Sequence, residues 1–226
     1  MPTVLITGAN RGIGLEFARA YAADGWIVHA CCRHPDKAKE LKALRKSIKT
    51  HRLDVTDGLQ VASLARELAD TPIDLLLNNA GIYGPRSGFG ETDYDEWLEV
   101  LKVNAQAPLR MAERFVEHVA KSERKVIANI SSRMGSIGEN SSGGSYIYRS
   151  SKAALNMVTK SLSIDLAARG ITVVSFHPGW VQTDMGGEGA DIPPTESVDG
   201  MRKVIAGLAR QSSGGFFNFD GKPIAW

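Results

Sequence analysis

The sequence predicts an α/β fold in which about seven parallel strands form one doubly wound sheet with helices on both faces. Three observations point to this fold class. Short apolar runs rich in Val, Ile and Leu alternate with longer amphipathic stretches. A glycine-rich turn joins the first apolar run to the first amphipathic stretch. The length of 226 residues suits one domain of this class, so residues 1–226 are expected to form a single domain.

Each apolar run is a predicted strand, and each amphipathic stretch between runs is long enough for a crossover helix. Strands are expected at residues 3–7, 26–32, 48–55, 73–79, 125–131, 171–177 and 215–219. Helices are expected at residues 14–24, 58–68, 94–121 and 146–169, the last one stopping at Gly170. Residues 185–197 hold three glycines and two prolines, which is typical of a mobile loop, and they are the candidate lid.

Composition and charge narrow the class of partner. The chain has 27 Lys and Arg against 25 Asp and Glu, a net charge of +2, which favours a small-molecule partner over nucleic acid or a membrane surface. No secretory leader or membrane-spanning run is evident, so a cytoplasmic protein is expected. The two cysteines, Cys31 and Cys32, are neighbours, a poor geometry for a disulfide and no framework for a metal site.

The glycine-rich turn has the sequence TGANRGIG, residues 7–14. Glycines between a strand and a helix let the backbone turn tightly and approach a pyrophosphate, which the positive helix N-terminus attracts. The spacing alone would also fit an ordinary turn, but the strand before it and the helix after it favour a Rossmann-type nucleotide site. The residues expected to contact the nucleotide here are Gly8, Asn10, Arg11, Gly12, Ile13 and Gly14.

The end of the second strand predicts which dinucleotide binds. NAD sites usually offer a carboxylate to the adenosine ribose, but here neutral Cys32 is followed by Arg33. Arg33 and Arg11 could both grip the 2′-phosphate of NADP(H), although both could also be solvated surface charges. After the third strand, Asp54 and the adjoining Val55 are expected at the adenine, and Asp57 as a helix cap.

The stretch GGSYIYRSSKAALNMV, residues 143–158, carries the candidate acid. Tyr148 and Lys152 are four residues apart and share one helix face. A developing alkoxide needs a proton, and an ammonium close to a phenol is expected to lower its pKa toward neutrality. Tyr146 has Ser150 at that spacing instead, which predicts a pocket wall or a packing aromatic. A YxxxK spacing alone would also fit an aromatic and a solvated lysine.

Two further polar positions stand out. The fifth strand delivers Ser131 and Ser132 to its carboxyl end, where a hydroxyl can donate to a substrate oxygen. Asn104 falls within an apolar row that would turn it toward the sheet, near a kink expected at Pro108. Asn104 could equally be an ordinary core asparagine.

Several motifs together resemble the short-chain dehydrogenase/reductase family: TGANRGIG, NNAG at 78–81, Asn104, NISS at 129–132, YRSSK at 148–152 and HPGWVQTDM at 177–185. YRSSKAALN and the closing GGFFNFDGKPIAW look like the branch that contains C-factor and Sniffer-type carbonyl reductases. The resemblance runs nearly end to end, and it implies an NADP(H)-dependent oxidoreductase that pairs into a homodimer or homotetramer through its long helices.

The resemblance also assigns roles. It implies that Ser132, Tyr148, Lys152 and Asn104 are catalytic, that Lys152 holds the nicotinamide ribose, and that Asn104 binds a relay water. Ser132 precedes Tyr148 by 16 residues, a longer gap than the family usually has, so Ser136 stays an alternative. The further residues implied to contact the cofactor are Asn78, Ala80, Gly81, Pro178, Gly179, Val181 and Thr183.

Six of these signals fall just past a predicted strand, and ligands of open parallel sheets bind at that carboxyl edge. They are Gly8, Arg33, Asp54, Asn78, Ser132 and Pro178. The expected function is NADPH-dependent reduction of an aldehyde, ketone or quinone. The alternatives are an NAD-dependent alcohol dehydrogenase and a nucleotide-binding signalling protein with little turnover. An apolar substrate pocket is expected from Tyr83, Phe89, Trp97, Met134, Ile137, Trp180 and Met185.

Overall fold

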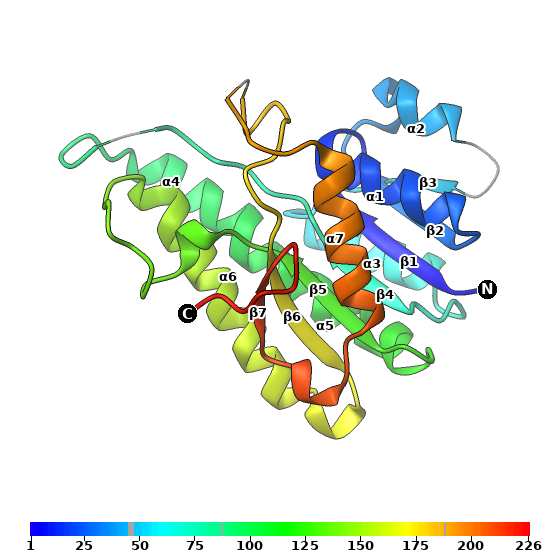
Figure 1. Cartoon of the computed structure of the whole chain (residues 1–226). Helices are drawn as coiled ribbons and strands as arrows, with labels where there is room; N and C mark the ends of the chain where they lie inside the picture. The colour runs from blue at the N-terminus through cyan, green and yellow to red at the C-terminus, as the bar shows by residue number, and fades with distance from the viewer. Residues whose placement is uncertain (45–47, 87, 188) are drawn as a thin grey trace.

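The computed structural model describes residues 1–44, 48–86, 88–187 and 189–226. Seven strands in these residues form one wholly parallel sheet in the order β3-β2-β1-β4-β5-β6-β7 (Figure 1). The strands are β1 (Thr3–Thr7), β2 (Ile27–Cys32), β3 (Ile48–Arg52), β4 (Leu75–Asn78), β5 (Val126–Ile130), β6 (Thr172–His177) and β7 (Phe216–Asn218). The strand order reverses between β1 and β4, which confirms the doubly wound, Rossmann-type sheet.

Helices cover both faces of this sheet. They are α1 (Gly12–Ala23), α2 (Lys39–Ala43), α3 (Gly58–Glu67), α4 (Tyr94–Leu101), α5 (Ala107–Ala120), α6 (Tyr146–Asp165) and α7 (Pro194–Ala206). One buried cluster joins α1 and α7 to one face, and a second joins α3, α5 and α6 to the other. Figure 1 shows α7 crossing in front of the sheet and α6 running behind it.

The strands are buried on both faces because successive side chains point to opposite sides. In β1, Val4 and Ile6 join the cluster under α1 and α7, whereas Leu5 joins the cluster under α3 and α5. All three side chains are fully buried. Burial of one such side chain is worth about 1.5–3 kcal/mol, so each central strand ties the two layers together.

Several predicted boundaries are wrong. The third strand ends at Arg52 instead of residue 55, and α1 begins at Gly12 instead of residue 14. The helix from Tyr146 ends at Asp165 and is followed by a short 3-10 turn before Gly170. This 3-10 turn explains why the predicted helix is too long. Gly170, with a φ of +71°, does end the helical conformation, but one 3-10 turn after the α-helix ends.

The predicted helix over 94–121 is interrupted, and the loop predicted at 185–197 is too long. A π-helical segment, η2 (Lys102–Gln106), separates α4 from α5. It ends two residues before Pro108, which occupies the first turn of α5, where its missing N–H costs nothing. Residues 194–197 form the first turn of α7, because Pro194 starts that helix. Residue 188 of the predicted loop lies outside the described residues.

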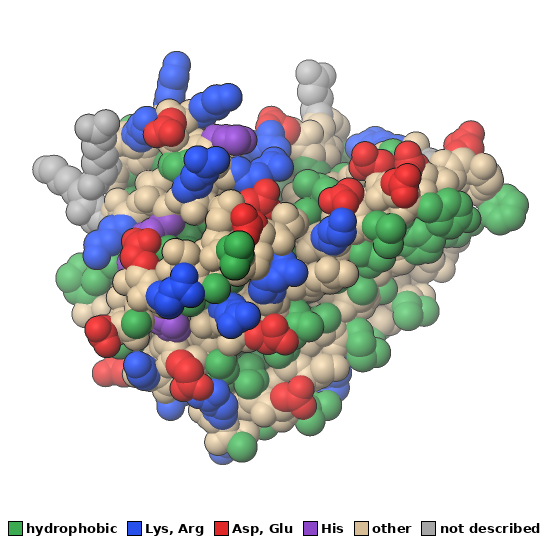
Figure 2. Space-filling model, turned by 180° about the vertical axis from the view of Figure 1, so that it is seen from behind, with side chains coloured by type: hydrophobic (Ala, Val, Ile, Leu, Met, Phe, Trp, Pro, Cys, Tyr) green, Lys and Arg blue, Asp and Glu red, His purple; other side chains and the backbone are tan. Residues whose placement is uncertain are grey.

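The surface carries charges of both signs, interspersed over the face seen in Figure 2. Apolar side chains gather in that view toward the edge that carries α4 and α6. Exposed apolar residues on these two helices are Tyr94, Leu98, Tyr146, Met157 and Ile164. None of the helices in the described residues combines the length and the hydropathy needed to cross a membrane.

Candidate active site

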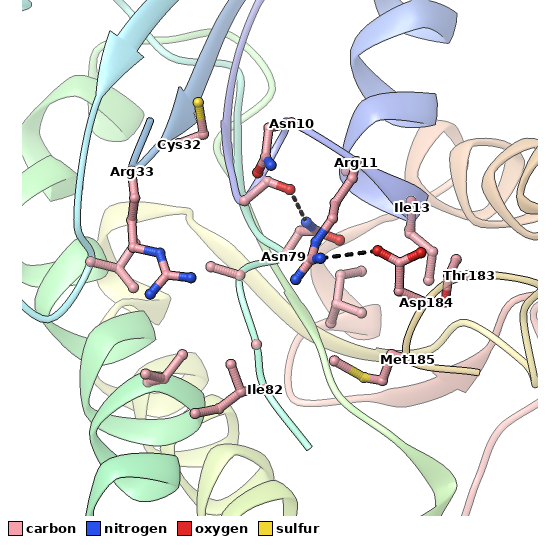
Figure 3. Close-up of a pocket in the computed structure, with 18 of the residues that line it drawn as sticks. Asn10, Arg11, Ile13, Cys32, Arg33, Asn79, Ile82, Thr183, Asp184 and Met185 are labelled. Atoms are coloured by element: carbon pink, nitrogen blue, oxygen red, sulfur yellow. Dashed lines mark hydrogen bonds and ion pairs between the residues drawn. The ribbon is translucent and has the colours of Figure 1, made fainter. Parts of the chain in front are cut away.

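A cavity of about 430 Å³ opens at the carboxyl ends of the central strands, where the strand order reverses (Figure 3). The glycine turn, the ends of β2 and β4, the start of α6 and the segment after β6 all contribute to its wall. The predicted site residues that line it are Gly8, Asn10, Arg11, Gly12, Ile13, Gly14, Arg33, Asp54, Val55, Ala80, Gly81, Tyr148, Lys152, Pro178 and Thr183. Most of the residues singled out in the sequence therefore meet at one place.

The glycine turn is built from close backbone contacts. Gly8 has a φ of +64°, and a Cβ on it would lie 2.9 Å from the Cα of Ala80. A Cβ on Gly14 would lie 2.3 Å from the carbonyl oxygen of Gly8. Both positions exclude a side chain, so the backbone can lie directly against a bound phosphate at the start of α1.

The two arginines lie on different sides of the cavity. Arg33 follows Cys32 at the end of β2 and is exposed. The Arg11 guanidinium donates to the carboxylate of Asp184 at 2.9 Å, and both side chains are exposed (Figure 3). Within the described residues no ion pair of Arg33 occurs, whereas Arg11 already has an anionic partner in the segment after β6.

The end of β3 presents Asp54 and Val55 to the cavity. The Asp54 carboxylate accepts from the backbone N–H of Thr56 at 2.9 Å and from its hydroxyl at 2.6 Å. These bonds hold the carboxylate in one orientation. Asp57 caps α3, since its side chain accepts from Leu59 and Gln60, as expected.

Asn78 is not at the cavity, and its placement there is wrong. The side chain is buried within the sheet, where its amide donates to the Asn129 side chain at 2.9 Å. The next residue, Asn79, lines the cavity instead, and its amide donates to the carbonyl oxygens of Thr7 and Gly8. Strand alternation explains the shift of one residue, because Asn78 is still the last residue of β4 and points inward.

Tyr148 and Lys152 lie on the buried face of α6. The Lys152 ammonium donates to the carbonyl oxygen of Ile130 at 2.8 Å and lies 5.8 Å from the centre of the Tyr148 ring. Burial lowers the pKa of Lys152 to about 8. Tyr146, two residues before Tyr148, is 41% exposed and does not line the cavity, whereas Tyr148 is 8% exposed.

The expectation that Lys152 lowers the pKa of Tyr148 is wrong for this structure. Burial raises the pKa of Tyr148 to about 12, a hydrogen bond with the Ser132 side chain opposes that rise, and the Tyr83 phenol adds to it. Desolvation of the phenolate outweighs the other effects because the ring is enclosed. Tyr148 is therefore held as a neutral phenol, the form that can donate a proton.

The two candidate serines have different neighbours. Ser132 lies at the end of β5 beside Tyr148, and its hydroxyl also accepts from the backbone N–H of Met134 at 3.2 Å. The Ser136 hydroxyl donates to the carbonyl oxygen of Trp226 at 3.4 Å and accepts from the backbone N–H of Glu139. Neither serine lines the cavity, but only the Ser132 side chain lies close enough to Tyr148 to affect the pKa of the phenol.

Asn104 lies in the π-helical segment η2 and is fully buried. Its amide donates to the carbonyl oxygen of Ile82 at 2.8 Å and to the Ser151 hydroxyl at 2.9 Å, and its oxygen accepts from the Ile82 N–H. A Cβ on Gly81 would lie 3.3 Å from that oxygen and 3.5 Å from Lys152 Nζ. Asn104 is thus a core amide with three hydrogen bonds, and its oxygen and the Lys152 ammonium both lie close to Gly81.

The segment after β6 closes the other end of the cavity. Pro178 and Thr183 line it, whereas Gly179 and Val181 do not. Gly179 has a φ of +86°, and a Cβ there would lie 2.6 Å from the Ile192 side chain, so the turn requires glycine. Val181 is 4% exposed and pairs with Ile192 in an isolated bridge. Both residues shape the segment behind the cavity wall.

Some cavity residues were not predicted as site residues. They are Leu53, Thr56, Asn79, Ile82, Glu99, Val103, Ile130, Ser131 and Asp184. Asn79 and Ser131 are next to predicted residues in the sequence. Knowing the exact residue at which each strand ends would have identified them. Glu99 and Val103 reach the cavity only because α4 and η2 pack there, which no sequence spacing indicates. No cluster of metal-ligating side chains occurs in the parts of the chain that the structure describes.

Comparisons with known proteins agree with this geometry. A family model described as short chain dehydrogenase matches residues 2–191. The chain is 42% identical over 164 residues to the C-signal of Myxococcus xanthus, covering 73% of this chain and 99% of that protein.

Solved structures are similar over the whole chain. The NADPH-bound carbonyl reductase from chicken fatty liver superposes with a TM-score of 0.94 at 37% identity, covering 100% of this chain and 99% of that one. The carbonyl reductase Sniffer of Drosophila melanogaster has a TM-score of 0.95 at 36% identity, with both chains fully covered.

Proposed function

Because the chain belongs to the short-chain dehydrogenase family, whose model matches most of its length, we propose that this oxidoreductase uses NADPH to reduce an aldehyde, ketone or quinone to an alcohol. One observation carries the proposal. Tyr148 and Lys152 line the same cavity as the glycine turn and the exposed Arg33, and the Ser132 side chain lies beside Tyr148, so a candidate acid and its partners adjoin the candidate nucleotide site. Solved carbonyl reductases of similar fold, one of them with NADPH bound, support it.

The residues of the cavity fit NADPH. Gly8 and Gly14 leave a backbone cradle that a Cβ would fill, and the start of α1 faces it. The exposed Arg33 offers a planar cation where an NAD site would offer a carboxylate, which favours the 2′-phosphate of NADPH over the free hydroxyl of NADH. Tyr148 and Lys152 would adjoin the nicotinamide end, and Thr183 the nicotinamide-side phosphate. Bound there, NADPH supplies the hydride.

The chain's own residues then handle the proton. The neutral Tyr148 phenol donates to the developing alkoxide, and the Ser132 hydroxyl stabilises the charge on the same oxygen. With a pKa of about 8, Lys152 is mostly protonated at neutral pH, so a positive charge lies beside the phenolate that forms. Asn104 adjoins that ammonium and is proposed to hold a water that returns the proton.

The similarity to the C-signal of M. xanthus favours a second candidate, a nucleotide-binding signalling protein with little turnover. The buried, bonded Tyr148 and Lys152 argue against it, since a signalling protein has no need to keep an acid next to an ammonium in a cavity.

A turnover screen separates the two candidates. We expect the protein to reduce members of a panel of aldehydes, ketones and quinones with NADPH in preference to NADH. Tyr148→Phe should keep NADPH affinity but lose about 10²- to 10⁴-fold in kcat, since it keeps the ring and removes the acid. The matched control, Tyr146→Phe, should change mainly KM. NADPH binding without turnover of any carbonyl would favour the signalling protein instead.

Self-association is a further part of the proposal. The exposed apolar residues Leu98, Met157 and Ile164 on α4 and α6 support pairing of two or four copies through these helices. Light scattering of the purified protein tests it, and a monomer at micromolar concentration would contradict it.

A further inference from the structure

Four side chains beside the proposed acid form one stack. The Tyr83 and Tyr148 rings lie 4.3 Å apart between centres, with 17° between their planes. The Arg86 guanidinium lies 5.3 Å above the Tyr83 ring, and Lys152 Nζ lies 5.8 Å from the Tyr148 ring. Each of the two stacked phenol rings therefore has a cation close to it, a contact that the electron-rich ring face favours.

Tyr83 is held at both its ring and its hydroxyl. Its hydroxyl lies 3.2 Å from the Ser145 hydroxyl in a shared hydrogen bond and 3.9 Å from the Met134 sulfur. Ser145 immediately precedes α6 and has a φ of +47°, which is unusual for a residue other than glycine. Its side chain makes no capping bond to the helix. The hydroxyl that would ordinarily cap α6 is thus bonded to Tyr83.

These contacts join the loop after β4 to the start of α6, which carries Tyr148. Ser132 and Tyr83 meet Tyr148 at different points, the hydroxyl and one ring face. The stacked pair restricts rotation of the Tyr148 ring. A proton donor displaced by about 1 Å can lose about 10²-fold in rate.

We propose that Tyr83 is a positioning residue that keeps the Tyr148 hydroxyl at Ser132, by covering one face of its ring and fastening the start of α6 through Ser145. The inference rests on the proposed reduction, in which Tyr148 is the proton donor. Arg86 also contacts the Tyr83 ring. Tyr83 itself transfers no proton, because its hydroxyl is directed to Ser145 and Met134.

Two substitutions separate the ring of Tyr83 from its hydroxyl. Tyr83→Leu removes the stack, and we expect kcat to fall about ten-fold or more while the Kd for NADPH stays within about two-fold. Tyr83→Phe keeps the ring and should restore most of kcat. Tyr94→Leu removes a tyrosine that is 70% exposed on α4 and serves as the matched control, with kcat unchanged.

A second measurement does not depend on turnover. The absorbance of tyrosinate is followed as the pH is raised. The difference between the wild-type curve and the Tyr148→Phe curve gives the ionisation step of the Tyr148 phenol. With the ring of Tyr83 gone, water reaches Tyr148 and its phenolate is less penalised, so Tyr83→Leu should move this step to lower pH. The titratable groups facing Tyr148 are Tyr83 and Lys152, and Lys152 is unchanged in this variant.

The outcomes distinguish this inference from the proposed function. A wild-type protein that reduces no carbonyl, but whose Tyr148 step moves in Tyr83→Leu, would refute the function and keep the positioning role. A normal kcat together with an unchanged ionisation step of Tyr148 in Tyr83→Leu would overturn the positioning role. A raised KM with unchanged kcat would also overturn it, because that result is typical of a residue in the wall of the substrate pocket. An equal loss of kcat in Tyr83→Phe and Tyr83→Leu would also overturn it.

Discussion

Tyr148 and Lys152 illustrate how much burial decides at the level of one residue. Their spacing of four places them on one face of α6. Burial then raises the pKa of Tyr148 to about 12 and lowers that of Lys152 to about 8. The two shifts move the pKa values of the phenol and the ammonium apart, and burial, not the partner, is the main cause of each. The proposed donor is thus stable as a neutral phenol until charge develops beside it.

Arg33 is the residue that should choose between NADPH and NADH. It is exposed at the end of β2 and lines the cavity, whereas Arg11 is paired with Asp184. Arg33→Ala should therefore reduce the preference for NADPH in kcat/KM by about ten- to a hundred-fold, the effect of one hydrogen bond to a charged group. Steady-state kinetics with both cofactors measure it. A wild-type enzyme that is indifferent to the 2′-phosphate would refute this assignment.

Ser132 and Ser136 provide a second comparison between single residues. Only the Ser132 side chain affects the pKa of Tyr148, whereas Ser136 hydrogen-bonds to Trp226 and Glu139. Ser132→Ala should lower kcat about 10²-fold or more, as loss of one donor to an oxyanion does. Ser136→Ala should leave kcat nearly unchanged and lower the melting temperature slightly. The reverse pattern of kcat values would assign the role to Ser136.

At the scale of elements, the π-helical segment η2 is the least expected feature. A π-helical segment carries one extra residue per turn, which rotates the residues after it relative to those before. Asn104 in η2 is thereby bonded to both Ile82 and Ser151, so it ties the loop after β4 to α6. Apolar spacing indicated a buried Asn104 correctly, but the interruption of the helix depends on the packing around it.

The segment between β6 and α7 stays the candidate lid, now with residues 185–193 instead of 185–197. It begins beside Thr183 and Asp184 in the cavity wall, and Asp184 pairs with Arg11 across the opening. We expect limited proteolysis within 185–193 to slow when NADPH and a substrate analogue are added, because both would contact this wall. Mass spectrometry of the fragments locates the cuts. Equal cleavage with and without ligands would contradict the lid.

At the scale of the whole molecule, one parallel sheet collects the site. Every strand is parallel, so every carboxyl end faces the same edge, and the reversal of order between β1 and β4 opens the cavity there. The two apolar layers on either face hold that edge rigid. Substitutions far from the cavity are therefore expected to act through stability.

Acid should destabilise the fold through two histidines between β2 and β3. His29 Nδ1 lies 2.9 Å from His51 Nε2, and His51 Nδ1 lies 3.3 Å from Glu67. Burial, with His51 and Lys49 adding to it, lowers the pKa of His29 to about 4, and burial also lowers that of His51. The unfolded chain therefore binds more protons than the folded one between about pH 6.5 and pH 4, so stability falls as the pH falls through that window.

Urea unfolding at several pH values measures this effect. The free energy of unfolding should drop by about 1 kcal/mol for His29 alone between about pH 7.5 and pH 5.5. His29→Leu should weaken the pH dependence, and the exposed His34→Leu serves as the control. A pH dependence that is the same in wild type and His29→Leu would contradict this account.

The sequence by itself determined the fold class, the order of the elements and most of the cavity wall. Alternating apolar runs and amphipathic stretches specify buried parallel strands with crossover helices, and strand ends then place Gly8, Arg33, Asp54 and Pro178 at one edge. These features depend on local periodicity and on connection rules that the chain carries everywhere.

Tertiary structure alone decided the rest. Whether Asn78 or Asn79 faces the cavity depends on where β4 ends, and the pairing of Arg11 with Asp184 joins residues 173 positions apart. The stack of Tyr83 on Tyr148 likewise joins two elements with no spacing in common. Burial, which sets the pKa values of Tyr148 and Lys152, exists only once both layers have packed, because desolvation depends on everything that surrounds a group rather than on its neighbours in the chain.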